Sequence, residues 1–372
     1  MTALLFQPTR IGGLTLPNRI AMPPLTRARA GQPGNVPTAL NATYYAQRAS
    51  AGLIVAEATD ISPDAKGYAL TPGIHSAAQI AGWRRVTDAV HRAGGRIFLQ
   101  IWHCGRMSHP DFHAGALPVA PSAVAFPGQV WQIGPDGQGG MVPCPTPRAL
   151  ETAEIAGIVA DFRQAAINAI EAGFDGVEVH GANGYLIDQF LRSTSNRRSD
   201  AYGGSRENRL RFLLEVTDAV IGAIGAARTG VRLSPRNRAN GMDCPDSIPT
   251  AVEAAARLAA RGVAYLHTNE PGDDSPEATA VRQQLRAAFP GPIIVAGGYT
   301  RERADAVLAA GEADLVAFGQ AFIANPDLPA RLLHGWPLNP PDGRTFFGGD
   351  PQGNAHGYTD YPTHAATGEQ PA

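Results

Sequence analysis

Residues Gly176–Tyr185 read GVEVHGANGY, a short aliphatic run that leads directly into turn-forming and hydrogen-bonding residues. The run predicts a buried β-strand, because valine favours strands and the glycines that follow favour a turn. The preceding stretch, Ala153–Ala172, has apolar residues at helical spacing, and we predict a helix with Thr152 as its N-cap and Gly173 just past its end. A helix that leads into a buried strand is the repeating unit of a parallel α/β fold.

Seven further strand-like runs lie before and after this stretch, and they alternate with helical stretches without a change in composition. With Gly176–Val179, the predicted strands are Arg19–Met22, Leu53–Ala56, Arg96–Ile101, Gly230–Leu233, Ala264–His267, Ile293–Val295 and Leu315–Phe318. The further predicted helices are Ser76–Ala93, Arg206–Ile224, Ser247–Arg261 and Thr300–Ala310. Eight strands separated mainly by helices favour an α/β fold with a single (β/α)8 TIM barrel over an open doubly wound sheet.

Two segments are too long for a minimal barrel. Residues 102–150, which are rich in glycine and proline, predict a hairpin or cap after the third strand, over the C-terminal face where barrel active sites lie. The tail from Gly335 is irregular, and we predict that it folds back over the same mouth. The predicted barrel domain spans residues 1–362, and residues 363–372 are predicted to form a disordered tail.

Composition narrows the class of function. The 31 Lys and Arg residues against 33 Asp and Glu residues give a formal net charge of −2, which argues against nucleic acid and anionic membrane as partners. No run of 18 apolar residues and no secretory signal is found, so we expect a soluble protein. The three cysteines, Cys104, Cys144 and Cys244, are widely spaced and fit a reducing cytoplasm.

Polar residues and glycines gather after the predicted strands, at the end of a barrel where active sites lie. In chain order they include Pro24, Thr26, Ala58, Gln100, Trp102, His180, Asn183, Tyr185, Arg232, Gly297, Gly298, Gly319 and Gln320. An arginine inside a barrel strand is costly to bury unless it meets an anion, which makes Arg232 a candidate binding residue. The glycines after strands seven and eight allow the backbone to approach a phosphate, although tight turns would explain each glycine taken alone.

The residues that follow strand four are suited to reduction of an α,β-unsaturated carbonyl. His180 and Asn183 offer two donors to a carbonyl oxygen, and the phenol of Tyr185 offers a proton to a carbanion. For His180 taken by itself, the alternative is a buried histidine with a structural role in the core and no part in the chemistry.

Several longer motifs resemble the old yellow enzyme family, over about Leu4–Pro362. They are LPNRIAMPPLTR (16–27), GLIVAEATDISPDAKGY (52–68), QIWHCGRMSH (100–109), AGFDGVEVHGANGYLIDQFL (172–191), SDAYGGSRENRLRFLLEV (199–216), VRLSP (231–235), VAGGYT (295–300) and GQAFIANPDLP (319–329). The resemblance implies a TIM barrel with tightly bound, non-covalent FMN, which NADPH or NADH reduces. An activated alkene, such as an enone, enal, maleimide or nitroalkene, is then expected to take the hydride, in a protein that is a monomer or homodimer.

The resemblance also implies roles for individual residues. Contacts to the isoalloxazine ring are expected from Pro24, Thr26, Ala58, Gln100 and Arg232, and contacts to the phosphate from Gly297, Gly298, Gly319 and Gln320. His180 and Asn183 are expected to bind the activating oxygen of the substrate, and Tyr185 to protonate the α-carbon after hydride reaches the β-carbon. Tyr68 and Trp102 are expected to form aromatic walls of the substrate pocket.

Two positions depart from the usual pattern of the family. Gln320 stands where the family usually has an arginine at the FMN phosphate, which removes a charge-assisted hydrogen bond of about 1.5–3 kcal/mol. Arg301 or Arg303, at the start of the helix after strand seven, is a candidate to compensate. Phe347 stands where many members have a tyrosine that lines the pocket, so we expect a more apolar substrate site. Asn183, in place of a second histidine, is a common variant that keeps a donor.

Other functions remain open from the sequence. A barrel enzyme that acts on a phosphorylated small molecule would share the glycine loops, but an aldolase needs an inner lysine, and the only lysine, Lys66, lies outside the predicted strands. His103, Cys104, His109 and His113 lack the spacing of metal ligands, so we interpret these histidines as solvated loop residues and predict no metal site. A non-catalytic flavin-binding protein would differ from an enzyme only in turnover.

Overall fold

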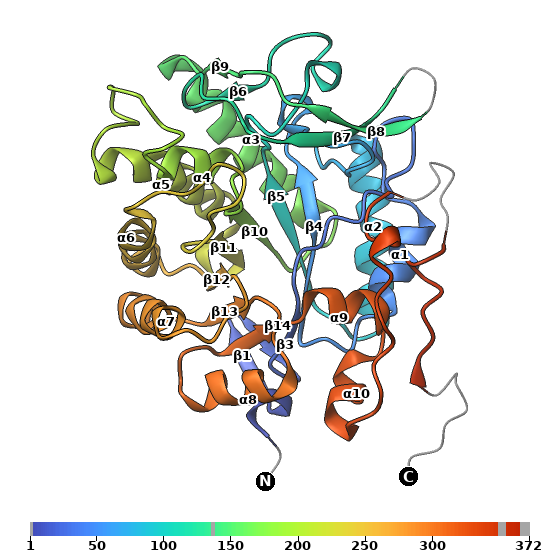
Figure 1. The fold of residues 1–372 in the computed structure, drawn as a ribbon. Helices are drawn as coiled ribbons and strands as arrows, with labels where there is room; N and C mark the ends of the chain where they lie inside the picture. The colour runs from blue at the N-terminus through green and yellow to red at the C-terminus, as the bar shows by residue number, and fades with distance from the viewer. Residues whose placement is uncertain (1–2, 135–137, 349–354, 365–372) are drawn as a thin grey trace.

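The computed structural model describes residues 3–134, 138–348 and 355–364, and its centre is a closed barrel of parallel strands (Figure 1). The order around the ring is β10-β11-β12-β13-β14-β3-β4-β5, and pairing of β14 with β3 closes it. The strands are β3 (Ile20–Met22), β4 (Leu53–Asp60), β5 (Ile97–Trp102), β10 (Gly176–Gly181), β11 (Thr229–Leu233), β12 (Tyr265–Asn269), β13 (Ile293–Ala296) and β14 (Leu315–Ala317). All are runs that the sequence predicts, so the predicted TIM barrel is confirmed.

Helices surround the ring (Figure 1). They are α1 (Ala39–Ala46), α2 (Ala77–Arg92), α3 (Thr152–Glu171), α4 (Leu186–Leu191), α5 (Arg206–Ile224), α6 (Ser247–Ala259), α7 (Pro276–Ala288), α8 (Arg301–Ala309), α9 (Gly319–Ala324) and α10 (Leu328–His334). Short 3-10 helices lie at η1 (Leu4–Phe6), η2 (Pro63–Ala65), η3 (Pro110–Phe112), η4 (Ala226–Arg228) and η5 (Gly343–Thr345).

The predicted start of α3 was wrong by one residue. Thr152 is the first helical residue, and Glu151 is the N-cap, with its backbone N–H donating to the Glu154 carboxylate at 2.7 Å. A glutamate at the third helical position accepts a hydrogen bond from the N-cap backbone N–H, and this bond fixes where the first turn of the helix begins. Gly173 does follow the helix, with a φ of 90° that favours glycine.

The end of the barrel opposite the site is closed by apolar residues. An antiparallel hairpin of β1 (Thr9–Ile11) and β2 (Leu14–Leu16), which the sequence analysis did not predict, supplies part of this plug. Its buried side chains pack with residues from several barrel strands in one cluster: Ile11, Leu16, Ala21, Leu53, Val55, Phe98, Ala264, Tyr265, Ile294, Ala296, Leu315 and Ala317. Because this end is filled, the C-terminal ends of the strands are left to carry the polar residues.

Residues 102–134 and 138–150 form the predicted cap. Strands β7 (Gln129–Ile133) and β8 (Gly139–Pro143) make an antiparallel hairpin, and β6 (Val119–Ala120) pairs with β9 (Arg148–Ala149). The hairpin is tied to the loop after β4, because the backbone N–H of Ala69 donates to the Trp131 carbonyl at 3.0 Å. Trp131 and Met141 of this hairpin then border a cavity together with Tyr185.

The described part of the tail packs against the N-terminal part of the chain, whereas the prediction placed it over the mouth of the barrel, where Phe347 of the tail borders a cavity. Arg27 donates to the Gly357 carbonyl at 2.8 Å, and its guanidinium lies 5.0 Å from the ring centroids of both Tyr44 and Tyr358. Those rings stack at 4.1 Å with an angle of 12° between their planes. In Figure 1 the red tail accordingly runs beside the blue helix α1.

The division into a 1–362 domain and a disordered 363–372 tail stays a prediction. His364 stacks on Trp336 at 4.1 Å, and residues 365–372 lie outside the described residues. None of the helices in the described ranges combines the length and the apolar character that a membrane crossing requires.

Tyr358→Ala is expected to lower the free energy of unfolding by about 3–5 kcal/mol, because it removes a buried ring that Tyr44 and Arg27 contact. Tyr358→Phe keeps the ring and loses only the hydrogen bond from Asn41, which should cost about 0.5–1.5 kcal/mol. Urea denaturation followed by tryptophan fluorescence measures both. Equal losses in the two variants would contradict the role of the ring in holding the tail.

Candidate active site

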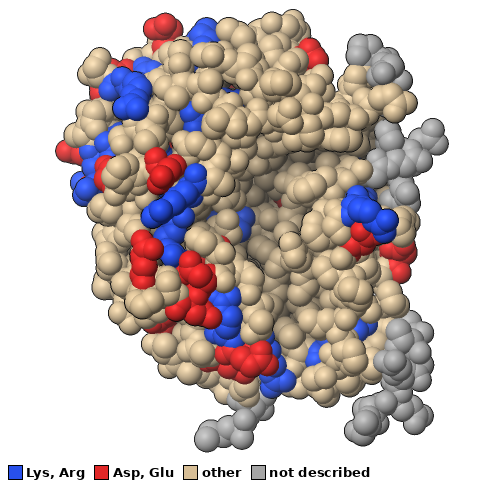
Figure 2. All heavy atoms as spheres, viewed as in Figure 1, with Lys and Arg blue, Asp and Glu red and all other residues tan. Residues whose placement is uncertain are grey.

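The C-terminal ends of the strands open into a hollow at the centre of the face shown in Figure 2. A cavity of about 430 Å³, here called the glycine-loop cavity, is bordered by Pro23, Pro24, Leu25, Arg232, Asn269, Ala296, Gly297, Gly298, Tyr299, Phe318, Gly319, Gln320 and Ala321. A second of about 270 Å³, the aromatic cavity, is bordered by Thr26, Ala28, Tyr68, Ala69, Trp131, Met141, Tyr185 and Phe347. Cavities of these sizes suit a cofactor and a small substrate.

Trp102 is the centre of an aromatic cluster at the mouth of the barrel. Its ring stacks on His180 at 6.1 Å with an angle of 8°, and on Tyr68 at 5.9 Å with an angle of 16°. Tyr185 meets the indole edge-on at 4.6 Å. The rings come from the ends of β5 and β10, from the loop after β4 and from the residue that precedes α4, so the barrel brings together side chains that are far apart in sequence.

A buried acid, which sequence reasoning missed, fixes the indole of Trp102. Its Nε1–H donates to Asp60 Oδ1 at 2.7 Å, and the hydroxyl of Thr71 donates to Asp60 Oδ2 at 3.1 Å. Burial raises the pKa of the Asp60 carboxyl to about 7, although the charge of Lys66 acts in the opposite direction. The only sequence signal was an aspartate at the end of a strand that begins with the aliphatic run Leu53–Ala56.

His180 and Asn183 are both neutral hydrogen-bond donors. His180 Nδ1 accepts from the backbone N–H of Ala182 at 3.3 Å, so the ring proton is on Nε2. Burial, and then the charge of Arg232, hold the pKa of His180 well below its usual range. Asn183 Oδ1 accepts from Asn269 at 2.9 Å, which leaves the NH2 group of Asn183 to donate elsewhere.

Tyr185 keeps its proton at neutral pH. Burial is the main cause that raises the pKa of its phenol above the usual value, and the nearby Cys104 adds to this effect. The hydroxyl of Tyr185 donates to the Tyr68 hydroxyl at 3.4 Å, which helps to orient it within the aromatic cavity.

A second buried acid, Glu178, organises the barrel core beneath the site. Gln100 Nε2 donates to Glu178 Oε1 at 2.7 Å, and His267 Nδ1 lies 2.8 Å from Oε2. Burial acts to raise the pKa of Glu178, but His267 and Arg232 outweigh it, and the pKa is lowered. Because Glu178 takes the amide N–H of Gln100, the carbonyl oxygen of Gln100 is left for another partner. An acid between two valines was the sequence signal for this group.

Arg232 has hydrogen-bonding capacity that the protein does not use. The residue is 6% exposed, its Nη2 lies 3.4 Å from Asn269 Oδ1, and its Nε has no partner among the described residues. Burial lowers the pKa of this guanidinium, and the charge of Glu178 opposes that effect. A buried, partly unsatisfied guanidinium that borders the glycine-loop cavity fits an anionic ring edge, such as that of a reduced flavin.

The loop after β13 needs both of its glycines. A Cβ on Gly297 would lie 2.6 Å from the Glu270 carbonyl oxygen, and Gly298 has a φ of 62° with open space beside it. Arg303 Nη1 donates to the Gly297 and Gly298 carbonyls at 3.3 and 2.9 Å, so it braces this loop. Arg301 instead contacts the Leu332 carbonyl and lies over the Phe6 ring. Neither arginine borders the glycine-loop cavity that the described residues form.

The interpretation of the loop histidines as solvated was wrong for His103. This residue lies at the start of the cap and is buried beside buried Cys104, and burial lowers its pKa to about 3. His113 is half-buried and its Nε2 lies 2.7 Å from the Ser108 hydroxyl. Within the described ranges, no group of three or more His, Cys, Asp or Glu side chains could hold a metal ion.

Two larger cavities lie at the edge of the site, one bordered by His103 and the other by Asn269. One of about 610 Å³ is bordered by residues of the cap and α3, including Asp161, and one of about 630 Å³ lies between the loops after β11 and β12, where Arg236 borders it. Neither is bordered by His180, Tyr185 or Arg232, so they lack the groups on which the chemical argument rests.

Most of the predicted site residues border one of the two site cavities. Pro24, Arg232, Gly297, Gly298, Gly319 and Gln320 border the glycine-loop cavity, and Thr26, Tyr68, Tyr185 and Phe347 border the aromatic cavity. Trp102 and His180 contact the ring of Tyr185, and Asn183 is hydrogen-bonded to Asn269, which also borders the glycine-loop cavity. Ala58 packs with Trp102, and Gln100 lies in the core beneath. Their roles stay predictions.

The raised pKa of Asp60 gives a testable pH dependence. Between about pH 4 and pH 7 the folded protein holds a proton that the unfolded chain has lost, so the Asp60 contribution to stability falls as pH rises through this range. Asp60→Asn keeps an acceptor for Trp102 but cannot ionise. Urea denaturation measures how far the free energy of unfolding falls between pH 5 and pH 8. This fall should be larger in the wild type than in Asp60→Asn by roughly 2 kcal/mol. An identical pH dependence would contradict the assignment.

A protein-family model described as the NADH:flavin oxidoreductase / NADH oxidase family matches residues 4–339. 12-Oxophytodienoate reductase 1 of Oryza sativa subsp. japonica is 48% identical over 367 residues, which cover 96% of this chain and 92% of that protein. Flavin oxidoreductase hxnT of Emericella nidulans is 42% identical over 386 residues, which cover 96% of this chain and 97% of that protein.

Solved structures agree with these matches. A structure of morphinone reductase in complex with tetrahydroNAD superposes with a TM-score of 0.93 at 51% identity, covering 98% of this chain and 99% of that one. The old yellow enzyme homologue from Zymomonas mobilis gives a TM-score of 0.90 at 44% identity, covering 96% of this chain and 99% of that one. Because the family model and the relatives cover nearly the whole chain, this protein belongs to the NADH:flavin oxidoreductase family of old yellow enzymes and is a flavin oxidoreductase built on a TIM barrel.

Proposed function

We propose that this flavin oxidoreductase is an FMN-dependent ene-reductase that reduces activated alkenes such as enones, enals, maleimides and nitroalkenes, with NADPH or NADH as the reductant. The observation that carries the proposal is the position of the Tyr185 phenol, whose ring lies 4.9 Å from that of His180, a neutral donor. Asn183, the second neutral donor, is hydrogen-bonded to Asn269, which borders the same cavity as Arg232.

Residues of the glycine-loop cavity and of the core beneath it would hold FMN without a covalent bond. When bound, FMN would supply the hydride for the alkene once the nicotinamide has reduced the flavin. Arg232 offers donors and positive charge to the anionic edge of the ring, and Gln100 offers its carbonyl oxygen. Backbone N–H groups near Gly298 and Gly319 suit the phosphate, with Gln320 as a neutral neighbour. Pro24, Thr26 and Ala58 complete the proposed ring contacts.

The two neutral donors activate the alkene. His180 Nε2–H and the Asn183 NH2 group donate to the carbonyl or nitro oxygen of the substrate, which withdraws electron density and makes the β-carbon electrophilic. Because both donors are already fixed by bonds to Ala182 and Asn269, little reorganisation is needed when charge develops on that oxygen.

Tyr185 completes the reaction as the general acid. Its raised pKa keeps the phenol protonated until the α-carbon becomes basic, when the proton moves from the Tyr185 oxygen to that carbon. Tyr68, Trp102 and Phe347 enclose the substrate and keep water from the reacting carbon.

Two other functions remain as alternatives in the proposal: a non-catalytic flavin-binding protein, and a barrel enzyme that acts on a phosphorylated small molecule. The second leaves the aromatic cavity and the Tyr185 phenol without a role. Relatives named as reductases of 12-oxophytodienoate and of morphinone also support a reductase. We further propose that the protein works in the cytoplasm, since its three cysteines are free thiols. We also propose that it is a monomer or homodimer.

Tyr185→Phe is expected to slow reoxidation of the reduced enzyme by cyclohexenone at least about 100-fold, because the general acid is lost. Reduction of the flavin by the nicotinamide should stay near the wild-type rate. Anaerobic stopped-flow absorbance measures both half-reactions. Tyr202→Phe is a matched control, since the Tyr202 hydroxyl donates to Glu215 away from both cavities. A Tyr185→Phe variant that slows both half-reactions equally would refute the general-acid role.

Arg303→Ala is expected to weaken FMN binding about tenfold, because the Gly297–Gly298 loop loses the hydrogen bonds that brace it. Arg301→Ala removes the same side chain two positions earlier, where it contacts Leu332 and Phe6, and should leave FMN affinity nearly unchanged. Fluorescence titration of the apoprotein with FMN gives both dissociation constants. Equal affinities for both variants and the wild type would show that the brace has no part in cofactor binding.

A further inference from the structure

The turn between β10 and α4 has an unusual backbone. Asn183 has a φ of 60° and Gly184 a φ of 87°, so two successive residues are in the left-handed region. Glycine adopts this conformation freely, whereas for a residue with a side chain it is less favourable, and asparagine is among the residues that tolerate it best. The surrounding structure must therefore hold Asn183 in place, and the direction of its side chain depends on that restraint.

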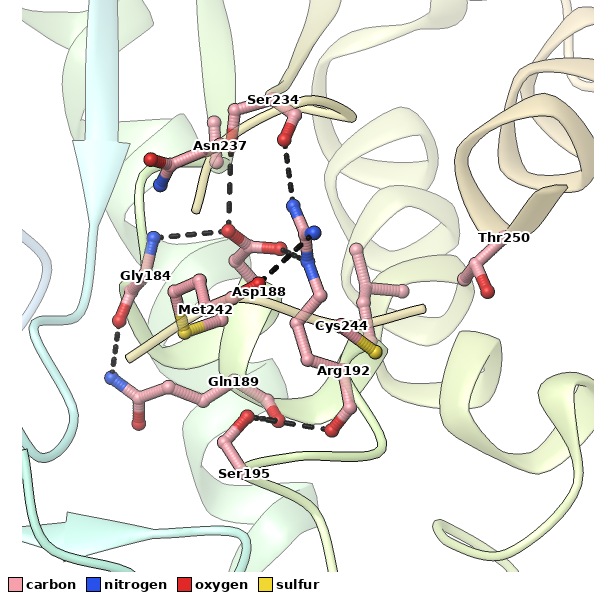
Figure 3. A network of polar contacts seen from close by, with 12 residues as sticks. Gly184, Asp188, Gln189, Arg192, Ser195, Ser234, Asn237, Met242, Cys244 and Thr250 are labelled. Atoms are coloured by element: carbon pink, nitrogen blue, oxygen red, sulfur yellow. Dashed lines mark hydrogen bonds and ion pairs between the residues drawn. The ribbon is translucent and has the colours of Figure 1, made fainter. Parts of the chain in front are cut away.

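Hydrogen bonds to the main chain hold this turn. The backbone N–H of Asn183 donates to Ser234 Oγ at 2.8 Å, and that of Gly184 donates to Asp188 Oδ2 at 3.0 Å. Gln189 Nε2 donates to the Gly184 carbonyl at 2.7 Å. Figure 3 shows Asp188, Gln189 and Ser234 around Gly184.

The acceptors of these bonds are themselves fixed by a buried ion pair. Arg192 Nε donates to Asp188 Oδ1 at 2.8 Å, and the side chains of Asp188 and Arg192 are only 1% and 4% exposed. Arg192 Nη2 also donates to the Ser234 carbonyl at 2.6 Å, and the Ser234 hydroxyl lies 3.4 Å from Asp188 Oδ2 (Figure 3). The pair thus links α4 to the residue that follows β11.

A buried ion pair is a poor source of stability. Removing two charges from water costs about as much as their attraction returns, and apolar residues of similar size often serve a core equally well. What this pair supplies, and apolar side chains cannot, is an oriented carboxylate for the Gly184 N–H and a fixed Ser234 hydroxyl for the Asn183 N–H.

We propose that Asp188, Arg192 and Ser234, here called the turn clamp, are positioning residues that hold the Asn183 amide toward the activating oxygen of the substrate. The clamp acts on Asn183 and not on His180, because His180 precedes the turn and lies in the β10 ladder, paired with Arg232 of β11. This inference rests on the proposed function, in which His180 and Asn183 bind the same oxygen.

The test uses the FMN-loaded enzyme and a para-substituted phenol, whose phenolate oxygen replaces that of the substrate. Ser234→Ala removes the acceptor of the Asn183 N–H but leaves the ion pair, and Asp188→Asn breaks the pair. Both should weaken phenol binding about tenfold, as the flavin absorbance reports, and raise the KM for cyclohexenone more than they lower kcat. Ser234→Thr keeps the hydroxyl and should bind the phenol as the wild type does. The rate of flavin reduction by NADPH should not change.

A double-mutant cycle separates positioning from general loss of stability. In an Asn183→Ala background, Ser234→Ala should have no further effect on phenol binding, since the amide that the clamp orients is gone. In a His180→Ala background, Ser234→Ala should keep its full effect of about tenfold. The same effect in both backgrounds would overturn the proposal.

Asp314→Asn is the control for the loss of a carboxylate. Asp314 accepts from the Ile293 N–H at 2.9 Å and from Arg286, which repeats the bonding of Asp188, but it precedes β14 at the opposite end of the barrel. This variant should bind phenol as the wild type does. If the wild type binds phenol and reduces the enone, and Ser234→Ala and Asp188→Asn do so equally well, the role of the clamp is overturned but the proposed function is not. Wild-type enzyme that does neither would overturn the proposed function and the clamp with it.

Discussion

Closure of the parallel ring is the constraint on which the site depends. When β14 pairs with β3, the carboxyl ends of the first and last barrel strands meet, so Pro24 and Gly319 border one cavity together with Arg232, Asn269 and Gly297. The hairpin of β1 and β2 fills the other end with apolar side chains, so polar groups have one side on which to gather. Without this pairing, residues that follow the first and last barrel strands would not border the same cavity.

The buried charges of this ring lie beside neutral hydrogen-bonding groups. Glu178 and Arg232 are buried charges in or near the core, and the partly unsatisfied guanidinium provides a positive floor for the glycine-loop cavity. Beside it, His180 and Tyr185 are neutral at ordinary pH because burial disfavours charge on the imidazole and the phenol, and Asn183 carries no charge. Fixed dipoles and charges of this kind stabilise charge as it develops, without reorganising at the moment of reaction. A positive floor suits an anionic cofactor ring, and a neutral mouth suits an uncharged alkene.

The sequence predicted the strands well because strands buried on both faces read as short aliphatic runs. It placed most site residues at the correct rim for the same reason. It missed the bond between Asp60 and Trp102, which lie 42 residues apart, and the clamp around Asp188, since aspartate and arginine on a helix usually face water. His103 was misread because its surroundings include residues distant in sequence, such as Leu186, whose backbone N–H donates to the His103 carbonyl.

The most direct test of the account is the visible spectrum of the purified protein in one anaerobic cuvette, with NADPH added first and cyclohexenone second. We expect a flavin absorption band that bleaches with NADPH and returns with the enone, in an amount equal to the enone consumed. A band that bleaches but does not return with any activated alkene would contradict the ene-reductase assignment and leave a flavin protein that exchanges electrons with another acceptor. A protein that stays colourless after added FMN would contradict the cofactor site itself.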